Sequence, residues 1–214
     1  MQAAIFPDHN LERIMRSKGT IVVLVVVLLV LFAGCAGCTT YNSLVASEEQ
    51  VEQVWGDVET QYQRRADLIP NLVNTVRGAA DFEQETLESV TQARARATSI
   101  NLTADDLADP AKVRAFQEAQ SQLSGALSRL LAVSENYPQL RATEAFRDLQ
   151  AQLEGTENRI SVARRDYNAT VRQHNTKVRR FPSNIFAGML GFDTRSPFEA
   201  DEGAEEAPTV DFSS

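Results

Sequence analysis

Residues 51–69 read VEQVWGDVETQYQRRADLI, and this stretch decides the fold class. Its apolar side chains recur at intervals of three and four residues, which is the period of one face of an α-helix. They are Val51, Val54, Trp55, Val58, Tyr62 and Ile69. Similar stripes follow toward the C-terminus, and no segment alternates apolar and polar residues as a half-buried strand does. The sequence therefore predicts an all-α protein.

Proline and polar residues divide this pattern into helices. The first stripe meets Pro70, where a helix ends, restarts or kinks, because proline lacks a backbone donor and crowds the preceding turn. A second stripe runs from Leu72 to Ala97, and Asn101–Asp109 is a polar connector. The pattern up to residue 109 thus indicates two helices and a loop.

The remaining pattern indicates two more helices. Asp109 and Pro110 are typical of the cap and first turn of a helix, which should stop near Asn136 because Pro138 disfavours helical geometry before it. A last stripe from Pro138 to Arg180 could reach about 65 Å as a helix. About four long amphipathic helices must bury their stripes against one another, which predicts an elongated antiparallel bundle.

Residues 19–38 form the N-terminal apolar segment. Ile21–Ala33 is unbroken in its apolar character, and the whole segment holds no charged residue. Twenty residues at helical rise match the hydrocarbon thickness of a bilayer. The segment therefore predicts a membrane anchor.

Two kinds of anchor remain open. One is a single spanning helix, and the other is a secretory signal ending in a lipoprotein cleavage box. In the second case Cys35 in Leu31-Phe32-Ala33-Gly34-Cys35 is the candidate lipidation site, and Cys38 is a weaker one. Phe32 departs from the small aliphatic residue usual in such a box. No second cysteine pair or nearby histidine accompanies Cys35 and Cys38, which disfavours a zinc or redox site.

The charges around this segment predict its orientation. Arg13, Arg16 and Lys18 precede it, and no Lys or Arg follows until Arg64. The positive-inside rule then places residues 1–18 in the cytoplasm and the body, residues 39–192, outside it. We expect a protein of the cell membrane with an extracytoplasmic body.

The C-terminal region divides into an apolar patch and an acidic tail. The patch between Ile185 and Phe192 should cover the end of the bundle, with contact to the membrane surface as the alternative. Residues 193–214 hold seven acids and one base, Arg195, and should lack fixed structure and add little stability. The net charge of -8 also argues against a nucleic-acid surface, which needs clustered Lys and Arg.

Five polar motifs lie within the helical pattern, and together they resemble the LemA family over residues 41 to about 200. They are YNSLV at 41–45, RRADLIPNLV at 64–73, ENYP at 135–138, ENRI at 157–160 and ARRDYN at 163–168. The resemblance implies a membrane-anchored helical bundle. The family is often described with a cytoplasmic body, whereas the charges of this chain indicate the opposite orientation.

Polar residues at helix breaks usually cap ends or fix helix pairing. The alternative is a recognition surface near Pro70 made of Arg65, Asp67, Asn71 and Asn74. No catalytic residue, metal ligand or cofactor site is predicted. The chain lacks paired Glu-x-x-His motifs, a phosphate-binding loop and a nucleophile elbow.

The sequence leaves two functions open for a chain that we do not expect to be an enzyme. The first is a structural or adaptor scaffold on the membrane, with other envelope proteins as partners and a homo-oligomer as one alternative. The second is a sensor or ligand-binding bundle that bends at Pro70.

Overall fold

The computed structural model describes residues 9–78 and 82–199, with side chains from residue 19 onward except those of residues 20, 32, 33, 35 and 36. Every regular element within these ranges is helical, which confirms the all-α prediction. The elements are α1 (His9–Arg77), α2 (Gln84–Ser99), the 3-10 helix η1 (Asp105–Ala108), α3 (Pro110–Ser134), α4 (Pro138–Ala142), α5 (Glu144–Arg179) and α6 (Ser183–Leu190).

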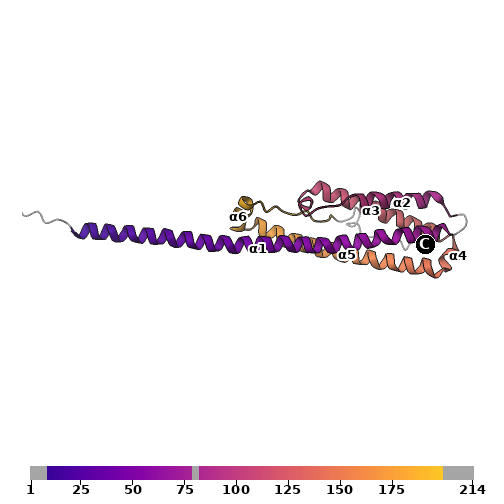
Figure 1. Cartoon of the computed structure of the whole chain (residues 1–214), viewed down its shortest axis with the longest axis horizontal. Helices are drawn as coiled ribbons and strands as arrows, with labels where there is room; N and C mark the ends of the chain where they lie inside the picture. The colour runs from indigo at the N-terminus through magenta and orange to yellow at the C-terminus, as the bar shows by residue number, and fades with distance from the viewer. Residues whose placement is uncertain (1–8, 79–81, 200–214) are drawn as a thin grey trace, which may run out of the picture.

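The longest element is α1, a continuous helix of 69 residues. At 1.5 Å per residue it extends over about 100 Å. Its N-terminal half projects alone, and the other helices gather along its C-terminal half (Figure 1). One helix therefore joins the N-terminal apolar segment to the bundle without a break.

Pro70 lies inside α1, so the helix neither ends nor restarts there. A helical residue 70 would normally donate its N–H to the carbonyl of Ala66, and proline cannot. In this structure Arg94 of α2 donates its Nε–H to Ala66 O at 2.8 Å. The carbonyl that the proline leaves without a donor is thus satisfied from a neighbouring helix, and α1 continues until Arg77.

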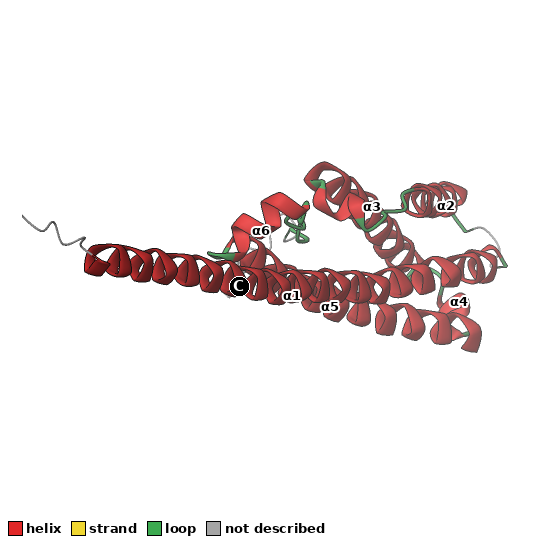
Figure 2. Ribbon diagram, turned by 60° about the vertical axis from the view of Figure 1, so that its left-hand side comes forward, coloured by secondary structure: helices red, strands yellow, loops and turns green. Residues whose placement is uncertain are grey.

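The bundle consists of two helix pairs. α1 and α5 run antiparallel and in contact along most of the body, α2 and α3 form the second pair, and α2 also packs on α1. The two views in Figures 1 and 2 agree on this arrangement, with α4 at the end far from the N-terminal half of α1 and α6 at the opposite end of the bundle.

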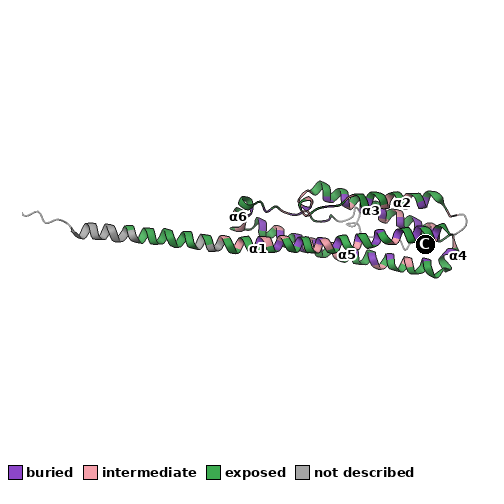
Figure 3. Ribbon diagram, viewed as in Figure 1, coloured by how far each residue is buried: buried purple, intermediate pink, exposed green. Residues whose placement is uncertain are grey.

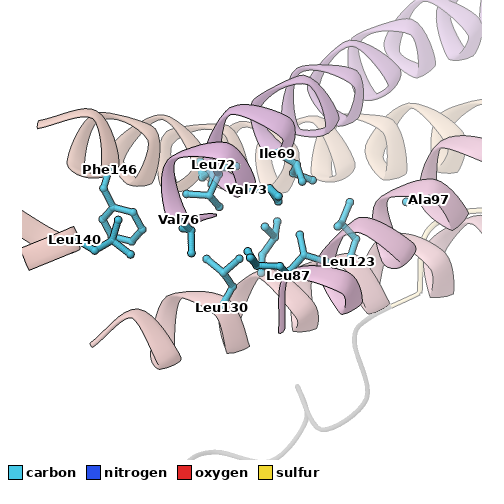
Figure 4. Packing of buried hydrophobic residues seen from close by; sticks show 13 residues of the cluster. Ile69, Leu72, Val73, Val76, Leu87, Ala97, Leu123, Leu130, Leu140 and Phe146 are labelled. Atoms are coloured by element: carbon cyan, nitrogen blue, oxygen red, sulfur yellow. The ribbon is translucent and has the colours of Figure 1, made fainter. Parts of the chain in front are cut away.

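Buried apolar residues form three clusters along the rod. The distal cluster, drawn in Figure 4, includes Ile69, Val76, Leu87, Leu130 and Phe146, whose side chains point toward one another from α1, α2, α3 and α5. A central cluster surrounds Trp55, and a third one around Leu44 lies where α6 packs. The stripe at residues 51–69 supplies the central cluster and the start of the distal one.

Helix boundaries agree with the sequence at one place and differ at another. Asp109 caps α3 by accepting a hydrogen bond from Ala111 N at 2.9 Å, with Pro110 in the first turn, as predicted. The single helix expected from Pro138 to Arg180 is instead divided into α4 and α5. Thr143 has an extended backbone (φ -70°, ψ 137°), and its Oγ1 accepts a hydrogen bond from Phe146 N, so it ends α4 and caps α5.

The C-terminal region also differs from expectation. Residues 193–199, which we call the C-terminal strap, have no regular secondary structure, yet they pack on the bundle through Arg195 and Phe198, both more than 90% buried. The expected absence of fixed structure is therefore wrong for these residues. Residues 200–214 and 1–8 lie outside the described chain.

The exposed part of the N-terminal half of α1 is apolar. Figure 3 shows this half free of the bundle, and every residue from Ile21 to Leu31 is between 47% and 65% exposed. Among the described residues, no helix is both long enough and apolar enough to cross a membrane.

Candidate functional site

The buried side chain of Arg65 makes four hydrogen bonds inside the bundle. It lies on the core face of α1 and is 1% exposed. Its Nη1 donates to Ser124 Oγ at 2.7 Å and to Glu157 Oε2 at 2.9 Å, and its Nη2 donates to Gln120 Oε1 at 2.6 Å and to Gln120 O at 3.3 Å. Four of its donors are therefore used, while Nε has no partner among the described residues. One guanidinium joins α1 to α3 and α5.

Burying a charge is costly unless it is paired and hydrogen-bonded. The Arg65 guanidinium meets this condition, and it also lies 5.1 Å from the centre of the Tyr62 ring. The Glu157 side chain is 51% exposed, so the ion pair reaches the surface on one side. This geometry fixes which faces of three helices meet, and we assign Arg65 to the structure of the bundle.

The other three predicted binding residues lie on a different face of α1. Asp67, Asn71 and Asn74 are exposed, and they are separated from Arg65 by the buried stripe. Asp67 and Asn71 line a groove of about 850 Å³, whereas Asn74 is not among its lining residues. The structure therefore brings together two of the four residues that the sequence grouped.

The groove runs between α1, the end of α2 and α3. Its lining is about equally polar and apolar, and the polar side chains include Glu59, Gln63, Thr98 and Asn101 in addition to Asp67. Asp67 accepts a hydrogen bond from Gln63 at 2.8 Å. Burial raises the pKa of Glu59 above its usual value. Such a surface offers carboxylates and amides to a polar ligand.

Metal binding finds no support in the part of the chain that the structure describes. No group of three His, Cys, Asp or Glu side chains is close enough there to hold a metal ion. Of the two candidate lipidation sites, Cys38 is a free and exposed thiol on α1. The side chain of Cys35 lies outside the described residues.

The C-terminal strap is held by residues that sequence reasoning did not assign to it. Asn168 of α5 donates its Nδ2–H to Phe198 O at 3.0 Å and accepts from Phe198 N at 2.8 Å. Seven residues later, Asn175 makes the same pair of bonds with Arg195, both at 2.8 Å. Each asparagine side chain thus bonds both the N–H and the C=O of one strap residue, as a neighbouring β-strand would.

A buried donor precedes each of these asparagines. Tyr167 is fully buried and donates its hydroxyl to Ser196 O at 3.0 Å. His174 is also fully buried, and its Nε2 donates to Asp193 O at 2.9 Å. The repeat of Tyr167-Asn168 and His174-Asn175 at helical heptad spacing is the signal that could have revealed a segment docked along α5.

The strap ends in an aromatic cluster. Phe198 is 4% exposed, and its ring lies 5.3 Å from that of Tyr167, 6.0 Å from that of Trp55 and 6.5 Å from that of Phe116. Arg164 lies over the Phe198 ring at 5.1 Å. Burial raises the pKa of the Tyr167 phenol well above its usual value. Tyr167 is therefore buried among these rings, and its hydroxyl helps to fix the strap.

Comparison with known proteins agrees with the resemblance noted in the sequence. The family model described as LemA family matches residues 54–212. The chain belongs to the LemA family. The five motifs quoted above include Arg65, Glu157, Tyr167 and Asn168, each of which makes a hydrogen bond described above.

Curated relatives are distant in sequence. Magnetosome protein MamQ 2 of Paramagnetospirillum magneticum is 24% identical over 186 residues, which is 79% of this chain and 68% of that protein. Protein LemA of Metamycoplasma hominis is 24% identical over 161 residues, covering 75% of this chain and 69% of that protein. Magnetosome protein MamQ of Magnetospirillum gryphiswaldense is 23% identical, with 79% and 68% covered. None of these names states a reaction.

Proposed function

We propose that this LemA family chain is a membrane-anchored helical scaffold that presents its bundle to other proteins. The observation that carries the proposal is the continuity of α1 (Figure 1). Its N-terminal half exposes an apolar run, and its C-terminal half supplies core residues such as Val51 and Ile69. An anchor and a bundle that share one helix are coupled rigidly, as a scaffold requires.

The exposed run supports the anchor. Ile21–Leu31 has no polar face, unlike the amphipathic helices of the bundle, and a large exposed apolar surface marks a site of membrane or protein contact. Residues 19–38 continue the run in the sequence to a length of about 30 Å, the thickness of the hydrocarbon core. We assign this surface to lipid.

The two kinds of anchor make different predictions for the mature chain. A spanning helix keeps the residues before Cys35, whereas lipoprotein processing removes them and modifies Cys35, or Cys38 if the second site is used. Mass spectrometry of the mature N-terminus separates the two. In both cases Arg13, Arg16 and Lys18 assign the body to the extracytoplasmic side. Protease added outside an intact cytoplasmic membrane should then digest residues beyond Thr40, and full protection of those residues would refute this orientation.

The groove beside Pro70 favours a second candidate, a ligand-binding bundle. The groove has a volume of about 850 Å³ and is lined by polar side chains that include Asp67 and Asn71. Volumes of this size are typical of small-molecule sites. The groove is equally able to hold a loop of a partner protein, so the identity of the occupant separates the two functions.

Crosslinking in intact cells tests the proposal. A photoreactive residue at Asn71 reports on the groove, and one at Asn158, which is exposed on α5, serves as the matched control. A stable protein captured from Asn71 and not from Asn158 supports the scaffold, and a second copy of this chain would indicate a homo-oligomer. A small molecule retained through purification, with no captured protein, would favour the ligand-binding bundle instead. The proposal assigns no catalytic residue and no cofactor.

A further inference from the structure

α6 is a short helix of residues Ser183–Leu190 that packs on α1 at the end of the bundle nearest the apolar segment (Figures 1 and 2). Its Ala187 is buried beside Leu44 and Phe192. The Phe186 ring lies so close to Gly37 that a β-carbon added there would be 3.2 Å from it. α6 therefore lies at the level of residues 37–44.

The opposite face of α6 is apolar and exposed. The exposed fractions are 52% for Ile185, 78% for Met189 and 51% for Leu190, and the preceding Phe181 is 76% exposed. The prediction that this patch covers the bundle end is thus correct for Phe192, and Phe186 is half-buried. Ile185, Met189 and Leu190 remain uncovered, as does Phe181 before them. Apolar side chains gathered on one short helix beside a proposed anchor require an apolar partner.

The position of α6 identifies that partner. Gly37 belongs to the apolar segment 19–38, and Phe186 touches it. If the segment spans the bilayer, residue 37 lies at its boundary. If Cys35 is lipidated instead, residue 37 lies about 3 Å further along the helix. With either anchor, α6 is at the level of the membrane surface.

The charges around α6 fit an anionic membrane. Residues 39–47 and 177–192 contain three charged side chains, Lys177, Arg179 and Arg180, which are all basic and exposed. The exposed Asp193 follows directly, so residues 177–193 have a net charge of +2 (three bases and one acid), whereas the whole chain has a net charge of -8. Basic residues next to an apolar helix are typical of contact with anionic lipid headgroups.

We propose that the exposed face of α6 inserts into the membrane interface as a second contact with lipid, beside the anchor. This inference rests on the proposed anchoring, because the bundle must be at the membrane for α6 to reach it. The second contact holds the bundle at a fixed angle to the bilayer, since a rod attached by one helix alone is free to tilt.

Tryptophan quenching in the full chain tests this inference. Met189→Trp places a reporter on the exposed face of α6, Val26→Trp reports on the anchor, and Asn158→Trp is the control on α5. All three retain Trp55, which is 4% exposed, and the unmodified chain gives its baseline. The proteins are reconstituted in vesicles of phosphatidylcholine and phosphatidylglycerol, with and without brominated acyl chains, which quench tryptophan on contact.

After the Trp55 baseline is subtracted, we expect the brominated lipids to quench the emission of the tryptophans at residues 26 and 189. The emission of the tryptophan at residue 158 should be unchanged. Quenching at residue 26 without quenching at residue 189 would overturn the contact of α6 and leave the anchor standing. If the emission of the tryptophan at residue 189 were blue-shifted but not quenched, protein would cover the patch. That result would also overturn the contact of α6 with lipid. The chain used is unprocessed and keeps residues 19–38, so absence of quenching at residue 26 would refute the embedding of this segment in lipid, and the inference with it.

Lipid charge provides a second readout. Quenching of the Met189→Trp variant should be stronger with phosphatidylglycerol than with phosphatidylcholine alone. Adding Lys177→Gln, Arg179→Gln and Arg180→Gln should remove that difference. The Met189→Trp variant that keeps Lys177, Arg179 and Arg180 decides the point. If its tryptophan were quenched equally in vesicles with and without phosphatidylglycerol, the assignment of an anionic surface would be overturned.

Discussion

Arg65 and Tyr167 show how single buried polar groups specify this bundle. Each is at most 1% exposed, and each contacts chain segments far away in sequence. Arg65 makes its bonds to α3 and α5, and Tyr167 makes its bond to the C-terminal strap. Both side chains occur in motifs that sequence reasoning singled out, but their partners became visible only in the fold.

Replacing Arg65 by Met should destabilise the bundle by about 2–4 kcal/mol, since it strands the Gln120 and Ser124 side chains without the bonds they make now. The neighbouring Arg64 is exposed, and Arg64→Met should change stability by about 0.5 kcal/mol or less. Urea unfolding of the two variants gives the comparison. Equal effects would show that the Arg65 bonds do not specify the helix packing.

Tyr167→Phe keeps the ring and removes the bond to Ser196 O, which should cost about 1–2 kcal/mol at neutral pH. Tyr167→Ala also loses the ring packing and should cost about 3–5 kcal/mol. Chemical denaturation measures both changes. If Tyr167→Phe left stability intact but abolished a cellular phenotype, the hydroxyl would have a functional role instead.

The same pair of proteins makes a prediction for alkaline pH. Because the folded pKa of Tyr167 is raised, the neutral phenol stabilises the fold fully below the unfolded pKa of about 10, and this contribution declines as pH rises above that value. The decline should approach about 1.4 kcal/mol per pH unit in the wild type and be missing in Tyr167→Phe. The stability difference between the two proteins should therefore shrink above pH 10, and a constant difference would contradict the burial of the phenol.

At the scale of elements, Pro70 and Arg94 act together. Arg94→Met should cost about 1–3 kcal/mol in the natural chain, because it leaves Ala66 O without a donor. With Pro70→Ala, the amide of residue 70 supplies that donor, so the same Arg94 change should cost less. A double-mutant cycle by urea unfolding measures the coupling, which we expect to exceed about 0.5 kcal/mol. Independent effects of the two substitutions would refute the explanation for the unbroken helix.

The C-terminal strap is the second element to test. A chain ending at Phe192 loses Phe198 from the aromatic cluster and the bonds to Asn168 and Asn175, so it should lose at least about 3 kcal/mol of stability. The melting temperature should fall by on the order of 10 °C. A chain ending at Glu199 is the matched control and should melt close to the full chain. Equal melting of the two truncated chains would show that the strap adds no stability.

These elements also show how far the sequence could be interpreted. The apolar period correctly predicted helices, and Asp109 with Pro110 correctly predicted the cap of α3. The sequence left open whether the helix ends, restarts or kinks at Pro70, because the donor that replaces the Pro70 amide comes from Arg94, a residue far away in sequence. It missed the strap, because the seven acids in residues 193–214 are typical of a disordered segment. The composition does not show that Phe198 is buried on the bundle. The four residues of the predicted binding surface were grouped by their closeness in sequence, whereas Arg65 is buried and Asp67 is exposed on a different face of α1.

At the scale of the whole molecule, α1 combines two environments in one helix. Its first half exposes apolar side chains from Ile21 to Leu31, and its second half is covered by α2 and α5. A continuous helix of about 100 Å with an apolar end is suited to hold the bundle directly beside the membrane. The central claim is that this apolar end is embedded in lipid.

Alkaline carbonate extraction of membranes tests that claim most directly. The full chain is compared with a variant carrying Val23→Lys, Val26→Lys and Leu29→Lys, which changes only exposed residues outside the bundle. Charged residues at the centre of a lipid-embedded helix are costly, so the variant should be released into the supernatant with the melting temperature of its bundle unchanged. The unmodified chain should remain in the membrane pellet. Recovery of the unmodified chain in the supernatant, or of both chains in the same fraction, would contradict the account.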